Sequence, residues 1–125
     1  KEMQSSSGII VSTGTGSTGW MTSVIMGAQA IANGKSRLNK DIPFRRDSDY
    51  LLFAVREPFP SKITGTKLIY GKITRDNPLK IESNMPKDGV IFGDGVERDY
   101  LEFTSGRTAI IQPSNKKIYL VRQKN

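Results

Sequence analysis

Hydroxyl-bearing side chains and glycines are concentrated in one short stretch of this sequence, directly before its single tryptophan. The hydroxyl groups belong to Thr13, Thr15, Ser17 and Thr18, the glycines are Gly14, Gly16 and Gly19, and the tryptophan is Trp20. Hydroxyls can bond ribose and phosphate oxygens, and glycines let backbone N–H groups approach an anion closely. An aromatic side chain adds a face on which a planar ring can stack. The stretch therefore predicts a loop that binds phosphate or a nucleotide.

The flanking segments predict how this loop is held. Residues 8–12 are apolar and β-branched, which is typical of a short buried strand. Residues 18–32 have helical spacing, and the apolar positions Trp20, Val24, Ala28 and Ile31 fall on one predicted face. We expect Ser17 or Thr18 to be the N-cap and Asn33-Gly34 to end the helix. Strand, small-residue loop and helix start is a layout that places backbone N–H groups around an anion.

The rest of the chain predicts β-structure. Strands are expected at residues 50–55, 66–73, 79–83, 90–92, 100–104, 108–112 and 117–121. Turn signals recur about every ten residues, which favours antiparallel strands in a sandwich-like array. The predicted fold is mainly β with one helix near the start, in a single domain that covers residues 1–125.

Composition excludes several classes of chemistry. The sequence has no Cys and no His, so thiol catalysis, disulfides, Ser-His triads and nearly all structural zinc sites are excluded. No apolar run is long enough to span a membrane, and none in these residues has the pattern of a secretory h-region. The net charge of +7 is compatible with an anionic ligand, with nucleic acid, or with a merely solvated basic surface. The basic residues do not form the aromatic-interleaved stripe that is typical of single-strand binders.

Gly14, Gly16 and Gly19 also match the dinucleotide fingerprint G-x-G-x-x-G. That fingerprint requires a second parallel strand ending in an acidic residue, but Asp41 follows a polar, basic stretch rather than an apolar strand. The loop has no G-K-[ST], so it is not a P-loop either. A plain turn before a helix is the simplest alternative. Three glycines in six residues, however, cost more conformational entropy on folding than a turn requires.

Three segments in order resemble NAD kinases. Residues 11–20 resemble the family segment V-S-T-P-T-G-S-T-A-Y, with Gly14 at the family's Pro, Gly19 at its Ala and Trp20 at its Tyr. Ser6-Ser7-Gly8 and the run from Phe53 to Pro58 are closer to the mitochondrial-type branch and its bacterial relatives. The run from Val90 to Gly95 is similar to a late strand of the family that ends in an Asp-Gly turn.

The resemblance implies that this chain is the C-terminal, NAD-binding half of a kinase with the NAD kinase/diacylglycerol kinase-like fold. Such an enzyme phosphorylates the 2′-hydroxyl of the adenosine ribose of NAD with ATP, giving NADP, and Mg²⁺ is expected with the full-length enzyme. The family's catalytic Asp lies upstream in a G-G-D-G motif, which is absent here, so the fragment alone is expected to be inactive. No catalytic or metal-ligating residue is expected within it.

The resemblance also implies partners and a location. The C-terminal half is expected to pack against its own N-terminal kinase domain and to assemble as a homodimer or tetramer. No membrane or nucleic-acid partner is expected. The implied compartment is the cytoplasm, or the mitochondrial matrix in a eukaryote.

Carried over position by position, the resemblance implies a set of NAD-contacting residues. They are Ser7, Thr13, Thr15, Ser17, Thr18, Gly19, Trp20, Ser23 and Asp94. Ser7 stands where many members have an Asp that reaches the nicotinamide amide. Alternative readings remain for three of them: Trp20 packing the helix on the sheet, Ser23 as an ordinary helix residue, and Asp94 as a turn residue.

Other interpretations remain open at this point. Arg56 and Glu57 are read as structural, either as an ion pair or as a subunit contact. The chain could instead belong to a sugar or lipid kinase of the same superfamily, or be a basic β-domain that binds nucleic acid. Steeply salt-dependent binding would identify the latter.

Overall fold

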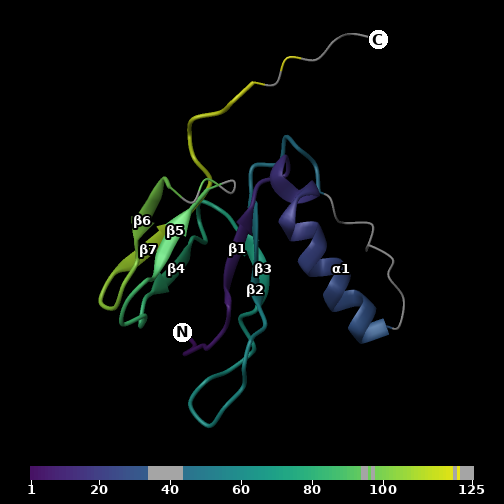
Figure 1. The fold of residues 1–125 in the computed structure, drawn as a ribbon. Coiled ribbons are helices and arrows are strands. Elements are labelled where there is room, and N and C mark those ends of the chain that lie inside the picture. The colour runs from purple at the N-terminus through teal and green to yellow at the C-terminus, as the bar shows by residue number, and fades with distance from the viewer. Residues whose placement is uncertain (34–43, 94–95, 97, 120, 122–125) are drawn as a thin grey trace. The chain divides into compact units, whose positions relative to one another are not determined.

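The computed structural model describes residues 1–33, 44–93, 96, 98–119 and 121 (Figure 1). The chain divides into two compact units, one formed by Lys1–Arg75 with Gln112–Asn125 and the other by Asp76–Ile111. The described elements confirm a mainly β protein with one α-helix near its start, and every strand pairing is antiparallel.

The first unit contains a three-stranded sheet with the order β1-β2-β3. Its strands are β1 (Gly8–Ser12), β2 (Leu51–Arg56) and β3 (Tyr70–Ile73). A short 3-10 turn, η1 (Gly16–Thr18), leads into the helix α1 (Trp20–Asn33). Figure 1 shows α1 alongside the sheet, so the chain reverses direction between β1 and α1.

The core of this unit lies between α1 and one face of the sheet. The register pairs Ser12 with Leu52 and Ile10 with Ala54, so these four residues share a face. Met21 and Ile25 of α1 pack against Leu52 and Ala54, and Phe44 completes the cluster. Burial of these side chains is the main source of stability that fixes α1 on the sheet.

The buried face of α1 differs from the predicted one. Met21 and Ile25 are buried, whereas Trp20 and Ala28 are exposed and Ile31 is 90% exposed. Val24 belongs to both faces, because it is partly buried against the core. The helix has apolar residues on two neighbouring faces, one with Met21 and Ile25 and the other with Trp20 and Ile31. The face with Met21 and Ile25 packs against the sheet.

The predicted N-cap is also wrong. Helix α1 begins at Trp20, and the Ser17 hydroxyl donates to the Gly14 carbonyl instead of accepting from an N–H of α1. Asn33 is the last residue of α1, and Gly34 lies outside the described residues.

The strand predictions are largely confirmed. Residues 8–12 and 90–92 are strands with the predicted bounds, and the strand predicted at 50–55 lies at 51–56. The strands predicted at 66–73, 79–83, 100–104 and 108–112 are present but shorter. The prediction for residues 66–73 is confirmed only over β3. The predicted strand at 117–121 is wrong, because its described residues belong to no sheet and the Ile118 side chain is fully exposed. Strand propensity reflects a fit to neighbouring strands, and this segment has no such neighbour in the structure.

The second unit consists of two antiparallel pairs. Strand β4 (Leu79–Glu82) pairs with β7 (Thr108–Ile111), and β5 (Val90–Phe92) pairs with β6 (Tyr100–Glu102). None of its described hydrophobic side chains is buried.

Ser83 joins these two pairs by hydrogen bonds. Its hydroxyl donates to the Phe103 carbonyl at 2.6 Å, and its N–H donates to the Arg107 carbonyl at 2.9 Å. Its carbonyl accepts the N–H of Gly106 at 3.1 Å, and Gly106 has a φ of +86°, which favours glycine. These hydrogen bonds around Ser83 therefore connect the two pairs of strands.

Substitutions in α1 test which face is buried. Met21→Ala removes a side chain that is 1% exposed and leaves a cavity, so we expect a loss of about 2–5 kcal/mol in the free energy of unfolding. Ile31→Ala on the same helix should change it by less than about 0.5 kcal/mol. Urea denaturation followed by far-UV circular dichroism measures both. Equal losses for the two variants would contradict the observed helix orientation.

Glu2 connects the N-terminal segment to the loop before β3. Its carboxylate accepts hydrogen bonds from Gln4 Nε2 at 2.7 Å and from the N–H groups of Lys67 and Leu68 at 3.0 to 3.1 Å. The Gln4 hydrogen bond, followed by that of the Leu68 backbone, holds the pKa of Glu2 below its ordinary value.

This pKa shift predicts a pH dependence for the Glu2 attachment. Because the pKa is lowered in the folded state, the stabilisation is present above the ordinary Glu pKa and is lost as the pH falls through the folded-state value. In Glu2→Gln we expect weaker hydrogen-exchange protection of the Lys67 and Leu68 amides at about pH 7, and a difference from wild type that shrinks as the pH falls through the folded-state pKa of Glu2. Glu57→Gln serves as the charge-matched control. Unchanged protection in Glu2→Gln at neutral pH would refute the attachment.

Candidate functional site

The seven residues that join β1 to α1 form a loop that is hydrogen-bonded to itself. The Thr13 hydroxyl accepts the N–H of Gly16 at 3.0 Å. The Gly14 carbonyl accepts both the N–H of Ser17 at 3.4 Å and its hydroxyl at 2.7 Å. The N–H of Gly19 donates to the Gly16 carbonyl at 3.0 Å. The sequence of short side chains thus folds into a compact turn.

These internal hydrogen bonds reduce the number of backbone N–H groups that the loop can donate to an anion. The sequence predicts that the N–H groups of residues 15–19 meet phosphate oxygens. Those of Gly16, Ser17 and Gly19 are instead bonded within the loop. A donor that is already bonded contributes little to an anion, so the loop presents hydroxyl groups rather than an open cradle of N–H groups.

Most of the predicted site residues lie at the surface. Ser17 is fully buried, and its hydroxyl is bonded to the Gly14 carbonyl, so a ligand contact through Ser17 would have to break that bond. Asp94 lies outside the described residues. The exposed ones are Ser7, Thr13, Thr15, Thr18, Gly19, Trp20 and Ser23.

The exposed residues fall into two groups, one at each end of β1. Ser7 directly precedes β1, whereas the other six follow it. Six residue steps from Ser7 to Thr13 separate the groups by roughly 20 Å at the usual rise of a strand. A ligand that contacts both groups must therefore be extended along β1.

Arg56 contacts one residue of each group, although the sequence did not single it out as a ligand-binding residue. Its guanidinium carbon is 4.7 Å from the centre of the Trp20 ring, a cation–π distance. Its carbonyl accepts the N–H of Ser7 at 3.0 Å. This contact depends on the pairing of Gly8 with Arg56, which brings the end of β2 beside the start of β1. That pairing is a property of the sheet and is not visible in the local sequence.

Two other cations near this part of the fold are bound to neighbouring side chains. Arg45 makes a two-pronged pair with Asp47, at 3.0 Å and 2.7 Å, which raises the pKa of Arg45 and lowers that of Asp47 through their side-chain hydrogen bonds. Lys72 Nζ lies 3.7 Å from the centre of the Tyr50 ring, which stacks on Phe44.

The backbone of residues 45 and 46 packs directly against the loop at Gly14. A Cβ at position 14 would lie 1.9 Å from the Arg45 carbonyl oxygen and 2.9 Å from the Arg46 Cα. No side chain fits there, which gives a physical reason for glycine at position 14.

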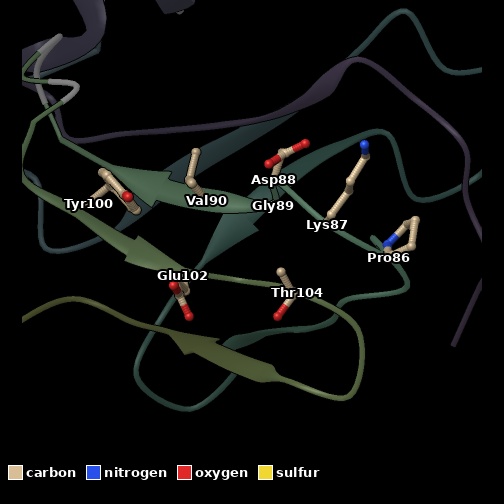
Figure 2. Close-up of a pocket in the computed structure, with 8 residues that line it drawn as sticks. All are labelled: Pro86, Lys87, Asp88, Gly89, Val90, Tyr100, Glu102 and Thr104. Atoms are coloured by element: carbon tan, nitrogen blue, oxygen red, sulfur yellow. The ribbon is translucent and has the colours of Figure 1, made fainter.

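A separate hollow lies in the second unit, with a volume of about 330 Å³ (Figure 2). Residues 86–90 line one part of it, and Tyr100, Glu102 and Thr104 line the other. Glu102 also pairs with Arg107 at 3.3 Å. The hollow contains none of the predicted site residues, so it is distinct from the site formed by the loop.

Metal ligation finds no support in the described part of the chain. There, no group of three or more Asp and Glu residues could hold a metal ion. The one described α-helix is too short to cross a membrane.

Comparisons with known proteins give no assignment. The chain matches no protein family model, no curated protein and no solved structure. The candidate site therefore rests on the geometry of the loop and on the chemistry of its residues.

A pair of glycine substitutions tests the loop packing. Gly14→Ala places a methyl group against the Arg45 carbonyl, so we expect a loss of about 1–3 kcal/mol in unfolding free energy and a displaced loop. Gly16→Ala is the matched control, because its Cβ would meet only the Ser12 and Thr13 hydroxyls at 3.3 Å and 3.4 Å. Urea denaturation and amide NMR shifts of residues 13–19 measure the two effects. A Gly14→Ala protein as stable as Gly16→Ala would refute the close approach.

Proposed function

We propose that this chain is the NAD-binding part of an enzyme that resembles NAD kinases and transfers a phosphoryl group from ATP to the 2′-hydroxyl of NAD. The observation that carries the proposal is the exposure of Thr13, Thr15 and Thr18 beside the exposed Trp20 ring, in one loop between β1 and α1. Hydroxyls and an aromatic face are what a ribose and a planar base require.

The spacing of the site favours a dinucleotide over a small phosphate compound. Ser7 and Thr13, the first residue of the loop, lie at opposite ends of β1, roughly 20 Å apart at the usual rise of a strand. Two ring systems joined through a pyrophosphate can reach both ends of such a site, whereas a single sugar phosphate reaches one. This consideration favours NAD over the sugar acceptors of the wider superfamily.

The role that we assign to this chain is positioning. Phosphoryl transfer depends mainly on placing the acceptor hydroxyl in line with the donor phosphate and on stabilising charge. The described residues can hold an acceptor ribose by hydroxyl groups but present no cluster of carboxylates. We therefore assign the catalytic aspartate and the ligands of Mg²⁺ to a preceding domain of the same enzyme, and we assign NAD contacts to this chain.

Charge distribution makes nucleic acid the second candidate. The first unit carries fifteen Lys and Arg against five Asp and Glu, whereas the second carries four against seven. The basic charge is thus concentrated in the unit that holds the loop, and a phosphate backbone would be attracted to it.

A fluorescence titration tests the proposal directly, because Trp20 is the single tryptophan of the sequence and its ring is 51% exposed. In full-length protein that includes this chain, with any other tryptophan replaced by Phe, we expect NAD to change the Trp20 emission in a saturable way. We expect Thr18→Val to weaken that binding by about 3–10-fold through the loss of one hydroxyl contact. Thr108→Val, on β7, removes an exposed hydroxyl outside the loop and should have no effect.

Two further measurements separate the alternatives. Full-length protein that includes this chain should form NADP from NAD and ATP faster than it phosphorylates diacylglycerol or sugars. Duplex DNA should not bind with a steep salt dependence. No emission change with NAD, together with steeply salt-dependent DNA binding, would replace the kinase proposal with the nucleic-acid one.

A further inference from the structure

We propose that Arg56 is a ligand-binding residue of this site, and that it binds the phosphate of a nucleotide whose base stacks near Trp20. This inference rests on the proposed function, because it names the residue that recognises the anionic part of the ligand. It starts from the cation–π contact of 4.7 Å between Arg56 and Trp20, which holds a positive charge at the centre of the candidate site.

The donors of Arg56 remain available in this arrangement. A guanidinium has five N–H donors, and stacking on an aromatic face engages its plane rather than these donors. Within the described part of the chain, the Arg56 side chain makes no hydrogen bond and no ion pair. A half-buried, always charged group whose donors are unused is suited to bind a phosphate in two-pronged fashion.

Glu57 does not neutralise Arg56, although the two residues are adjacent. Its φ is +47°, an uncommon value for a residue other than glycine, and Pro58 follows it. The chain therefore turns sharply directly after Arg56, and no Arg56–Glu57 ion pair forms among the described contacts.

The loop itself gives a second reason to look for a side-chain cation. Three of its N–H groups are bonded internally, so the loop binds hydroxyl-bearing groups better than anions. Arg45 is paired with Asp47, and Lys72 lies over Tyr50. Arg56 contacts both parts of the site, through its guanidinium to Trp20 and through its carbonyl to Ser7.

The inference predicts a preference for nucleotides over nucleosides. AMP and adenosine share the same base and ribose, and they differ only in the phosphate that Arg56 would bind. In Trp20 emission titrations of full-length protein that includes this chain, with any other tryptophan replaced by Phe, we expect AMP to bind about tenfold more tightly than adenosine, in keeping with one charge-assisted contact in a partly exposed site.

Variants at Arg56 separate a specific contact from general electrostatics. Arg56→Gln should bring the AMP-to-adenosine ratio to about one while leaving adenosine binding within about twofold, and Arg56→Lys should retain part of the ratio. Arg46→Gln is the matched control, because it removes the same charge from an exposed residue of the same unit whose backbone adjoins Gly14. It should leave the ratio unchanged.

Far-UV circular dichroism checks that each variant is folded. If Arg56→Gln does not fold, the comparison of Arg56→Lys with wild type provides the test.

The outcomes distinguish this inference from the proposed function. If NAD changes the Trp20 emission but Arg56→Gln leaves the nucleotide preference intact, the role of Arg56 is refuted and the NAD proposal stands. If Arg46→Gln lowers the ratio as much as Arg56→Gln, general attraction explains the preference and Arg56 has no specific role. If neither NAD nor AMP affects the emission, the proposed function fails and the role of Arg56 fails with it.

Discussion

The packing of Met21 and Ile25 on Leu52 and Ala54 determines most of the first unit. Strand β2 presents Leu52 and Ala54 on one face of the sheet. Only a nearby apolar surface can remove these two side chains from water. Helix α1 provides that surface, but it follows β1 after seven residues, so the chain must reverse within a short loop. The loop that carries the candidate ligand contacts is therefore placed by the burial of residues that never touch a ligand.

Inside that loop, some of the small polar side chains form hydrogen bonds that hold the turn. Ser17 is buried because its hydroxyl completes the bonding of the Gly14 carbonyl, and Thr13 accepts the N–H of Gly16. What remains at the surface is a set of hydroxyls and one indole ring. The charge that such a site needs for a phosphate comes from a neighbouring strand, where Arg56 lies against that ring. Hydroxyl recognition and anion recognition are thus assigned to different elements.

Sequence patterns predicted the features that depend on local order. The bounds of β1 and β5 follow from short apolar runs between turn residues, and the single helix follows from its periodicity. The same reasoning identified the loop residues that the structure exposes. It failed where the outcome depends on partners far along the chain: the stripe of α1 that faces the sheet, the unpaired segment at 117–121, and the approach of Arg56 to Trp20. The pairing of β1 with β2 spans some forty residues, and no local pattern contains it.

The close approach at Gly14 means that two distant segments can change only together. A Cβ at position 14 would overlap the backbone at Arg45, and no choice of rotamer relieves a clash with backbone. A descendant of this protein that acquired Pro or Ala at position 14 would need a different path for the chain after residue 44. A side chain at position 14 is therefore compatible with this fold only if the backbone at residues 45–46 moves as well.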